Sequence, residues 1–262
     1  MNPSLRTSAS GMIAQQRMID VIANNLANVN TTGYKRSRVS FQDVLYETIQ
    51  GGELVSDQGS EVVAPIQIGK GVRVAGILRL HSQGAAEMTQ RPLDLAIDGA
   101  GFFQVERPDG TIAYTRDGNF SLSESGTLVT SSGYLVLPGI TLPQDATSVA
   151  VSGGGIVSIT ASGAAHPIEA GRIELVRFLN PSGLLSVGEN LYAETYASGT
   201  PMMGYAQEEG FGRILQGTLE SSNVEIVQEM TDMIAAQRAY EINAKAIQVG
   251  EDMMYVTSDL IR

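Results

Sequence analysis

The sequence predicts an α+β protein in which an antiparallel β-rich middle lies between long N- and C-terminal helices. Of the 29 glycines, only Gly11, Gly33 and Gly250 fall in residues 1–40 and 225–262. Helix interiors exclude glycine, whereas turns between strands collect it. Apolar residues also recur every seven positions at both ends, which is typical of helices that pack along one face.

The N-terminal helix is predicted over residues 5–29. Its apolar stripe consists of Leu5, Met12, Ile19 and Leu26. Seven residues make about two helical turns, so these side chains share one face. The segment from Asn30 to Gly33 then predicts the helix stop, because Asn and Gly tolerate the left-handed conformation.

The C-terminal helix is predicted over residues 225–261, with Ser221, Ser222 or Asn223 as its N-cap. Its stripe is longer and consists of Ile226, Met233, Tyr240, Ile247, Met254 and Ile261. Such a sustained period is typical of coiled coils, although most amphipathic helices only pack within one monomer. Residues 1–40 carry five basic and one acidic residue, and residues 225–262 carry seven acidic and three basic. The two ends therefore carry opposite net charges, which favours pairing of the two helices. Because the seven-residue period is also sustained, we expect the helices to pack against other copies as well.

The middle of the chain alternates apolar and polar residues between tight turns. Leu93–Ile97 ends in a turn at Asp98-Gly99, after which Phe102–Val105 resumes a strand. Asp109-Gly110 then lies between Phe102–Val105 and Ile112–Thr115, which is a hairpin signal. This predicts a meander or Greek-key sheet. Further strands are expected at 128–130, 134–137, 149–151, 156–160, 172–178 and 191–195. The expected domains are 1–35 with 225–262 as the helical coiled-coil domain, 36–80 with 205–224 as an extended connector, and 81–204 as the β-rich outer domain.

No catalytic, cofactor-binding or metal-binding residues are predicted. The chain has no cysteine, which excludes disulfides, thiolate metal sites and a Cys nucleophile. Its two histidines, His81 and His166, lie far apart in the sequence and are interpreted as surface or loop residues. The net charge of −11 argues against nucleic-acid binding. No cleaved signal peptide and no membrane insertion are expected, since no apolar run is long enough.

Four motifs in order resemble flagellar rod and hook axial proteins. They are Ala23–Lys35 (ANNLANVNTTGYK), Pro92–Val105 (PLDLAIDGAGFFQV), Tyr114–Val136 and Gly217–Met254. Within the first motif, the residues that carry the resemblance are Asn24, Asn25, Leu26, Asn28, Gly33 and Tyr34. The motifs span nearly the whole chain, and its length fits the distal-rod members of this family.

The resemblance implies a structural, non-enzymatic subunit of the flagellar distal rod in the periplasm. Such subunits are exported unfolded through the flagellar type III apparatus and polymerise at the tip into a helical tube that transmits torque. The implied partners are further copies of the chain, proximal rod subunits, hook subunits and the P/L-ring bushing. A proximal-rod or hook-type subunit is the alternative within the family. A secreted β-rich hydrolase is the alternative from another class.

Overall fold

The computed structural model describes residues 3–50, 54–55, 61–62, 65–143, 145–161 and 166–260. The chain forms two compact units. The first combines residues 1–26, 37–78 and 225–262, and the second combines residues 27–36 and 79–224. Helices therefore occupy both ends of the chain around a β-rich middle, and the expected α+β class is confirmed. The three-part division expected from the sequence stays a prediction.

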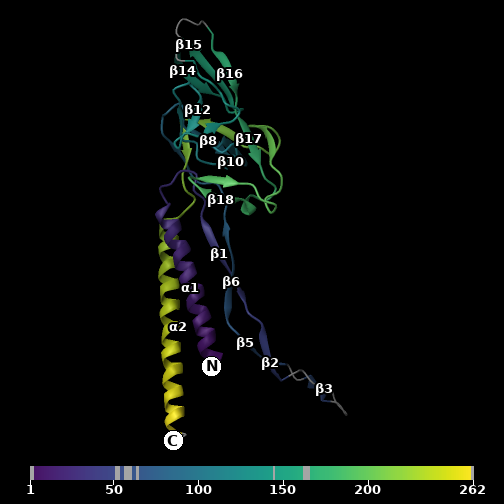
Figure 1. Cartoon of the computed structure of the whole chain (residues 1–262), viewed down its shortest axis with the longest axis vertical. Helices are drawn as coiled ribbons and strands as arrows, with labels where there is room; N and C mark the ends of the chain where they lie inside the picture. The colour runs from purple at the N-terminus through teal and green to yellow at the C-terminus, as the bar shows by residue number, and fades with distance from the viewer. Residues whose placement is uncertain are drawn as a thin grey trace. The chain divides into compact units, whose positions relative to one another are not determined.

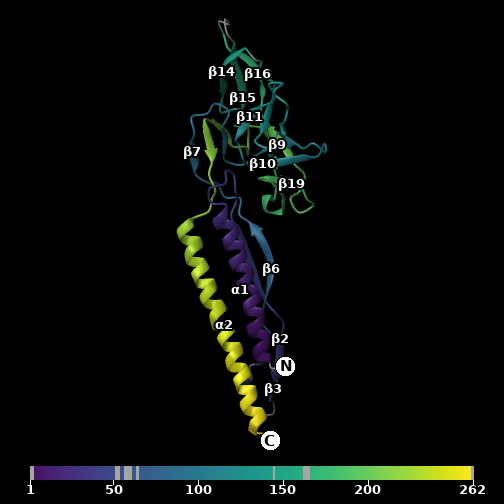
Figure 2. The same cartoon turned by 60° about the vertical axis from the view of Figure 1, so that its left-hand side comes forward.

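The first unit consists of two long helices and a set of paired strands. The helices are α1 (Pro3–Ala27) and α2 (Ile226–Leu260). Figures 1 and 2 show them side by side, running in opposite directions. The strands pair as β1 (Ser37–Asp43) with β6 (Val72–Arg79), β2 (Tyr46–Gln50) with β5 (Ile66–Gly69), and β3 (Leu54–Val55) with β4 (Glu61–Val62).

The second unit is built on a nine-stranded antiparallel sheet. Its main path runs β11 (Phe120–Leu122), β12 (Leu128–Thr130), β13 (Leu135–Val136), β9 (Phe102–Glu106), β10 (Ile112–Thr115), β19 (Leu191–Ala193), β18 (Leu185–Gly188). Off this path, β17 (Glu174–Arg177) pairs with β9 and with β20 (Met202–Tyr205). A three-stranded sheet holds β14 (Ala146–Val151), β15 (Ile156–Ala161) and β16 (Ile168–Arg172). Two further pairs join β8 (Leu95–Asp98) to β21 (Arg213–Gln216) and β7 (Ala86–Met88) to β22 (Thr218–Glu220).

The two faces of β9 fill two separate clusters. Phe103 packs in the large core with residues of β8, β15 and β17, edge-to-face against Phe120. Phe102 points the other way and joins a smaller aromatic cluster with Tyr114 and Phe178. Successive side chains of a strand face opposite sides, so the adjacent phenylalanines anchor both faces of the sheet.

Two local expectations are wrong. The strand expected over 172–178 is divided, because β16 ends at Arg172 and pairs with β15, whereas β17 begins at Glu174 and pairs with β9 and β20. The N-cap expected among residues 221–223 is displaced, since α2 begins at Ile226. The Asn223 side chain instead bonds the Leu80 and Ser82 carbonyls.

Candidate functional site

The two helices of the first unit pack together along their length. Near one end the Asn25 amide donates to Glu229 Oε2 at 3.1 Å. Farther along, a methyl group added to Gly11 would lie 3.0 Å from Asn243 Nδ2, and one added to Gly250 would lie 2.8 Å from Leu5 Cδ2. The missing side chains at these two glycines therefore let the helix backbones approach closely.

The predicted stripes lie beside this seam. On α1, Leu5, Met12, Ile19 and Leu26 are all half-buried. On α2, Met233 and Ile247 are half-buried, Ile226, Tyr240 and Met254 are exposed, and Ile261 lies outside the described residues. The buried line of α2 instead lies three residues further along the chain from the stripe positions and contains Glu229, Ala236 and Gly250. The self-assembly role of the predicted stripes stays a prediction.

Apolar side chains cover other faces of α2. Those in the described part of the helix range from 52% exposed at Met230 to 79% at Val227. They are Val227, Met230, Ile234, Ile242, Val249, Met253, Tyr255 and Val256. In this single chain each of these residues is more than half exposed. A set of exposed apolar residues of this size marks an interaction surface.

Among the motif residues, Asn25 makes the best-defined contacts in the first unit. It is buried, and its side chain exchanges two 2.9 Å hydrogen bonds with the backbone N–H and carbonyl of Ser37. Its amide also donates to the buried Glu229 carboxylate. One side chain thus ties the end of α1 to the start of β1 and to α2. Of its neighbours in the motif, Asn24 is exposed and Leu26 is half-buried.

The remaining motif residues belong to the second unit. Asn28 is half-buried and accepts from the Thr31 hydroxyl at 3.2 Å. Gly33 is buried at a backbone φ of +67° and donates its N–H to the Glu220 carbonyl at 2.8 Å. Tyr34 is buried beneath the Arg79 guanidinium, which lies 5.7 Å from its ring centre. The motif therefore marks a packed turn.

Three buried charges form an ion triad next to this turn. Lys35 Nζ lies 2.5 Å from Glu220 Oε1, and Arg116 Nη1 lies 3.2 Å from Glu220 Oε2. The Gly84 N–H also donates to Glu220 Oε1 at 2.9 Å. Lys35 donates further to the Ser82 carbonyl at 2.7 Å. Each carboxylate oxygen of Glu220 is thus satisfied by a cation, as a buried ion pair requires.

Burial and charge act in opposite directions on the cations of this triad. Burial lowers the pKa of the Lys35 ammonium, and the Glu220 carboxylate partly offsets that shift by attraction and hydrogen bonding. The pKa of Arg116 is lowered by burial and raised by Glu220 in the same way. The Arg116 guanidinium also donates to the Gly99 carbonyl at 2.8 Å. Glu220 therefore holds two cations in a place where neither would be stable alone.

Sequence reasoning missed the triad and its neighbour Asn223. Asn223 Oδ1 accepts the Arg36 N–H at 2.7 Å, close to the Lys35–Glu220 pair. Lys35 and Glu220 both lie inside the quoted motifs, but they are 185 residues apart. The available signal was the presence of charged residues within the motifs, but nothing in their spacing shows that they meet.

His81 lies in a loop, which is one of the two positions expected from the sequence, but its ring is turned inward. Both of its ring nitrogens are buried without a hydrogen-bond partner in the structure, and the ring packs edge-to-face on Phe102 and Tyr192. Burial, reinforced by the charges of Lys35, Arg79 and Arg116, lowers the pKa of His81 from 6.5 to about 3. The imidazole is therefore neutral at physiological pH.

This depressed pKa predicts a loss of stability in mild acid. Below pH 6.5 His81 binds a proton in the unfolded chain but stays neutral in the folded chain. The free energy of unfolding therefore falls as the pH drops toward 3. At pH 5 the loss is about 2 kcal/mol relative to pH 7.5. Urea titrations of the wild type, His81→Phe and the exposed-site control His166→Gln measure it. A pH dependence that is unchanged in His81→Phe would refute this assignment.

The acidic residues and histidines of the described part of the chain do not gather into a metal-binding group. No group of three or more His, Asp or Glu residues is placed to hold a metal ion within the described residues. The helices described here are also too short or too polar to span a membrane. The buried polar groups instead connect segments of the chain to one another, which is what a structural protein needs.

Comparison with known proteins identifies the family. Three family models match: "Flagella basal body rod protein" over residues 5–35, "Flagellar hook protein FlgE/F/G D1 domain" over 96–159, and "Flagellar basal body rod FlgEFG protein C-terminal" over 215–260. The chain is 47% identical to the flagellar basal-body rod protein FlgG of Caulobacter vibrioides over 258 residues, covering 98% of each protein. It is 46% identical to FlgG of Borreliella burgdorferi over the full length of both. It is 38% identical to FlgF of Caulobacter vibrioides, covering 100% of the chain and 96% of FlgF.

The chain therefore belongs to the family of flagellar basal-body rod proteins, and the resemblance seen in the sequence is confirmed. It is a structural protein of the rod in the flagellar basal body. Its identity to FlgG exceeds its identity to FlgF within the same organism, which places it on the FlgG side of the family. The first and third matched segments contain Lys35 and Glu220, the two residues joined in the ion triad.

Proposed function

We propose that this chain polymerises with copies of itself into the distal rod, a helical tube that carries torque from the motor to the hook. In this proposal the terminal helices form a coiled-coil domain that is completed by neighbouring subunits. The β-rich unit forms the outer wall, where its acidic surface stays hydrated.

The observation that carries this proposal is the exposure of apolar side chains on α2. Burial of apolar area stabilises association by about 25 cal/mol per Å². Eight large apolar residues in the described part of α2 lie outside its seam with α1. Their burial between subunits supplies a driving force that the single chain lacks, offset by the entropy of ordering the helix ends.

The remaining partners follow from the same proposal. A rod that joins motor and hook must contact proximal rod subunits at one end and hook subunits at the other. Along its length it turns inside the P/L-ring bushing. Export through the flagellar type III apparatus would deliver the chain unfolded, and the absence of cysteine means that no disulfide has to form afterwards.

Charged residues on the exposed apolar face of α2 should prevent assembly without unfolding the chain. Ile242→Asp combined with Val249→Asp places two carboxylates where the proposal puts a subunit contact. Electron microscopy of the purified wild-type chain at high concentration should show straight tubes, and the double variant should show none. Both proteins should retain the same circular dichroism spectrum.

The matched control is Gln237→Asp, which adds a carboxylate at an exposed polar position of the same helix. It should still form tubes and support swimming in cells. Normal tubes and normal motility in the Ile242→Asp, Val249→Asp variant would refute the role given to this face.

A further inference from the structure

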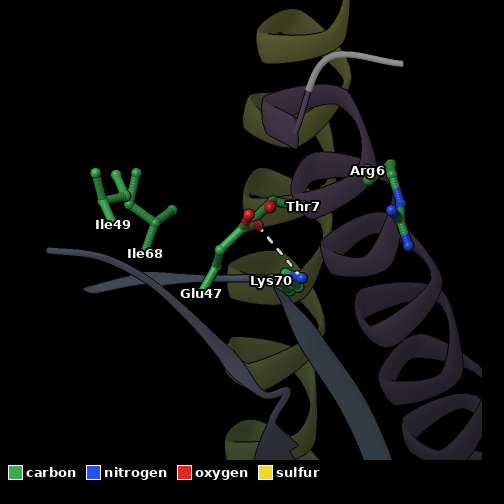
Figure 3. Close-up of a pocket in the computed structure, with 7 residues that line it drawn as sticks. Arg6, Thr7, Glu47, Ile49, Ile68 and Lys70 are labelled. Atoms are coloured by element: carbon green, nitrogen blue, oxygen red, sulfur yellow. Dashed lines mark ion pairs between the residues drawn. The ribbon is translucent and has the colours of Figure 1, made fainter. Parts of the chain in front are cut away.

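Two hollows follow one side of α1 in the first unit. One has a volume of about 420 Å³ and lies between Ser10–Arg17 of α1 and Val72–Ile77 of β6. The other, about 270 Å³, lies between Arg6 and Thr7 of α1 and the β2–β5 pair (Figure 3). Between the two hollows, Ser10 Oγ accepts the Val72 N–H at 3.2 Å, so the start of β6 is bonded to α1 there. The two hollows lie on either side of this contact, along one face of α1 between Arg6 and Arg17, and we call them together the α1 groove.

The α1 groove has apolar walls and a positive charge. Ile13 is 61% exposed and Ile77 is 54% exposed at one hollow. At the other hollow, Figure 3 shows Ile49 and Ile68 side by side, and Lys70 facing Glu47 at 3.3 Å. The charged lining residues of the two hollows are Arg6, Arg17, Lys70, Arg73 and a single acid, Glu47. Such a surface fits an apolar helix that carries acidic residues.

The C-terminal half of α2 has that chemistry. Ile242, Val249, Met253 and Val256 are exposed at spacings of three, four and seven, which place them on one helix face. Glu241 and Asp252 border this face, together with one base, Lys245. A helix that lays apolar residues at this spacing into a groove is a common recognition mode.

We infer that the α1 groove of one copy receives residues 241–256 of α2 from a second copy. This inference rests on the proposed function and names the surfaces through which the subunits meet. From Ile242 to Val256 the helix rises about 21 Å, enough to reach both hollows, which together follow about 17 Å of α1. The two surfaces differ and lie on the same chain, so repetition of the contact from copy to copy builds an open filament when the rotation between copies does not close into a ring.

Disulfide trapping tests the contact directly, because the wild-type chain has no cysteine. Ile77→Cys protein is mixed at high concentration with Met253→Cys protein and oxidised mildly. A disulfide requires the two Cβ atoms to come within about 4.5 Å, so the inference predicts a heterodimer on non-reducing gels. Thr111→Cys, at an exposed position of the second unit, replaces Ile77→Cys in the control and should yield no heterodimer above background.

Charge exchange gives an independent readout. Arg73→Glu should raise the concentration for half-maximal assembly about tenfold, and adding Asp252→Arg in the same chain should restore most of the loss. Arg107→Glu reverses the charge of a half-buried residue on the second unit, outside the proposed contact, and should leave assembly unchanged. Tubes that form normally in Arg73→Glu, with no heterodimer, would overturn the inference and leave the proposed function standing. If the wild-type chain formed no tubes and the Ile77→Cys and Met253→Cys proteins formed no heterodimer, the inference and the proposed function would both be overturned.

Discussion

Replacing Glu220 with glutamine is expected to lower the free energy of unfolding by about 3–5 kcal/mol, the largest loss that we expect from any single charge in the chain. The carboxylate is buried, and it is the shared anionic partner of Lys35 and Arg116. Glutamine keeps the size of the side chain but leaves two buried cations without an anion. Breaking a buried ion pair from one side costs far more than the pair itself contributes.

Urea denaturation of dilute, unassembled protein, followed by circular dichroism, measures this loss. Glu124→Gln makes the same chemical change at an exposed position of the same unit and should alter stability by less than about 0.5 kcal/mol. Lys35→Met should cost less than Glu220→Gln, because Glu220 then keeps both Arg116 and the Gly84 N–H. Equal stabilities for Glu220→Gln and the wild type would show that the triad does not hold the turn.

The elements of this fold could be predicted where the pattern is local. The heptad spacing placed both helices within a few residues of α1 and α2, because amphipathic periodicity depends only on neighbours in the sequence. The Asp98-Gly99 and Asp109-Gly110 turns similarly bracketed β9 and predicted its pairing with β10. Strands paired at long range, such as β21 with β8, left no such signal.

The helix seam could not be predicted from apolar residues alone. Its buried positions on α2 are Glu229, Ala236 and Gly250, which a search for hydrophobic stripes passes over. Small residues allow close packing, and Glu229 is buried beside the Asn25 amide. The predicted apolar stripe lies at the margin of this seam, and the other exposed faces of α2 carry the residues that the proposed polymer would bury.

Gly33→Ala is expected to destabilise the chain by about 2–4 kcal/mol, the second large effect. The residue sits at a φ of +67°, which a side chain disfavours. The added methyl group would also lie 2.7 Å from the Asp117 nitrogen and 2.8 Å from the Arg116 carbonyl carbon, and these are backbone atoms that cannot rotate away. Relief of that clash would pull on the Gly33–Glu220 hydrogen bond and on the segment that carries Arg116.

Gly110→Ala separates the two causes, because Gly110 has a φ of +76° but no atom within 4 Å of an added methyl group. It should cost only the conformational strain, about 1 kcal/mol. Urea denaturation of both variants under the same conditions gives the difference, which measures the crowding at Gly33. The motif glycine is then required by the close approach of Arg116 and Asp117 as well as by its backbone angle. If the two variants lost equal stability, the angle alone would account for Gly33, and its packing against Arg116 and Asp117 would contribute nothing.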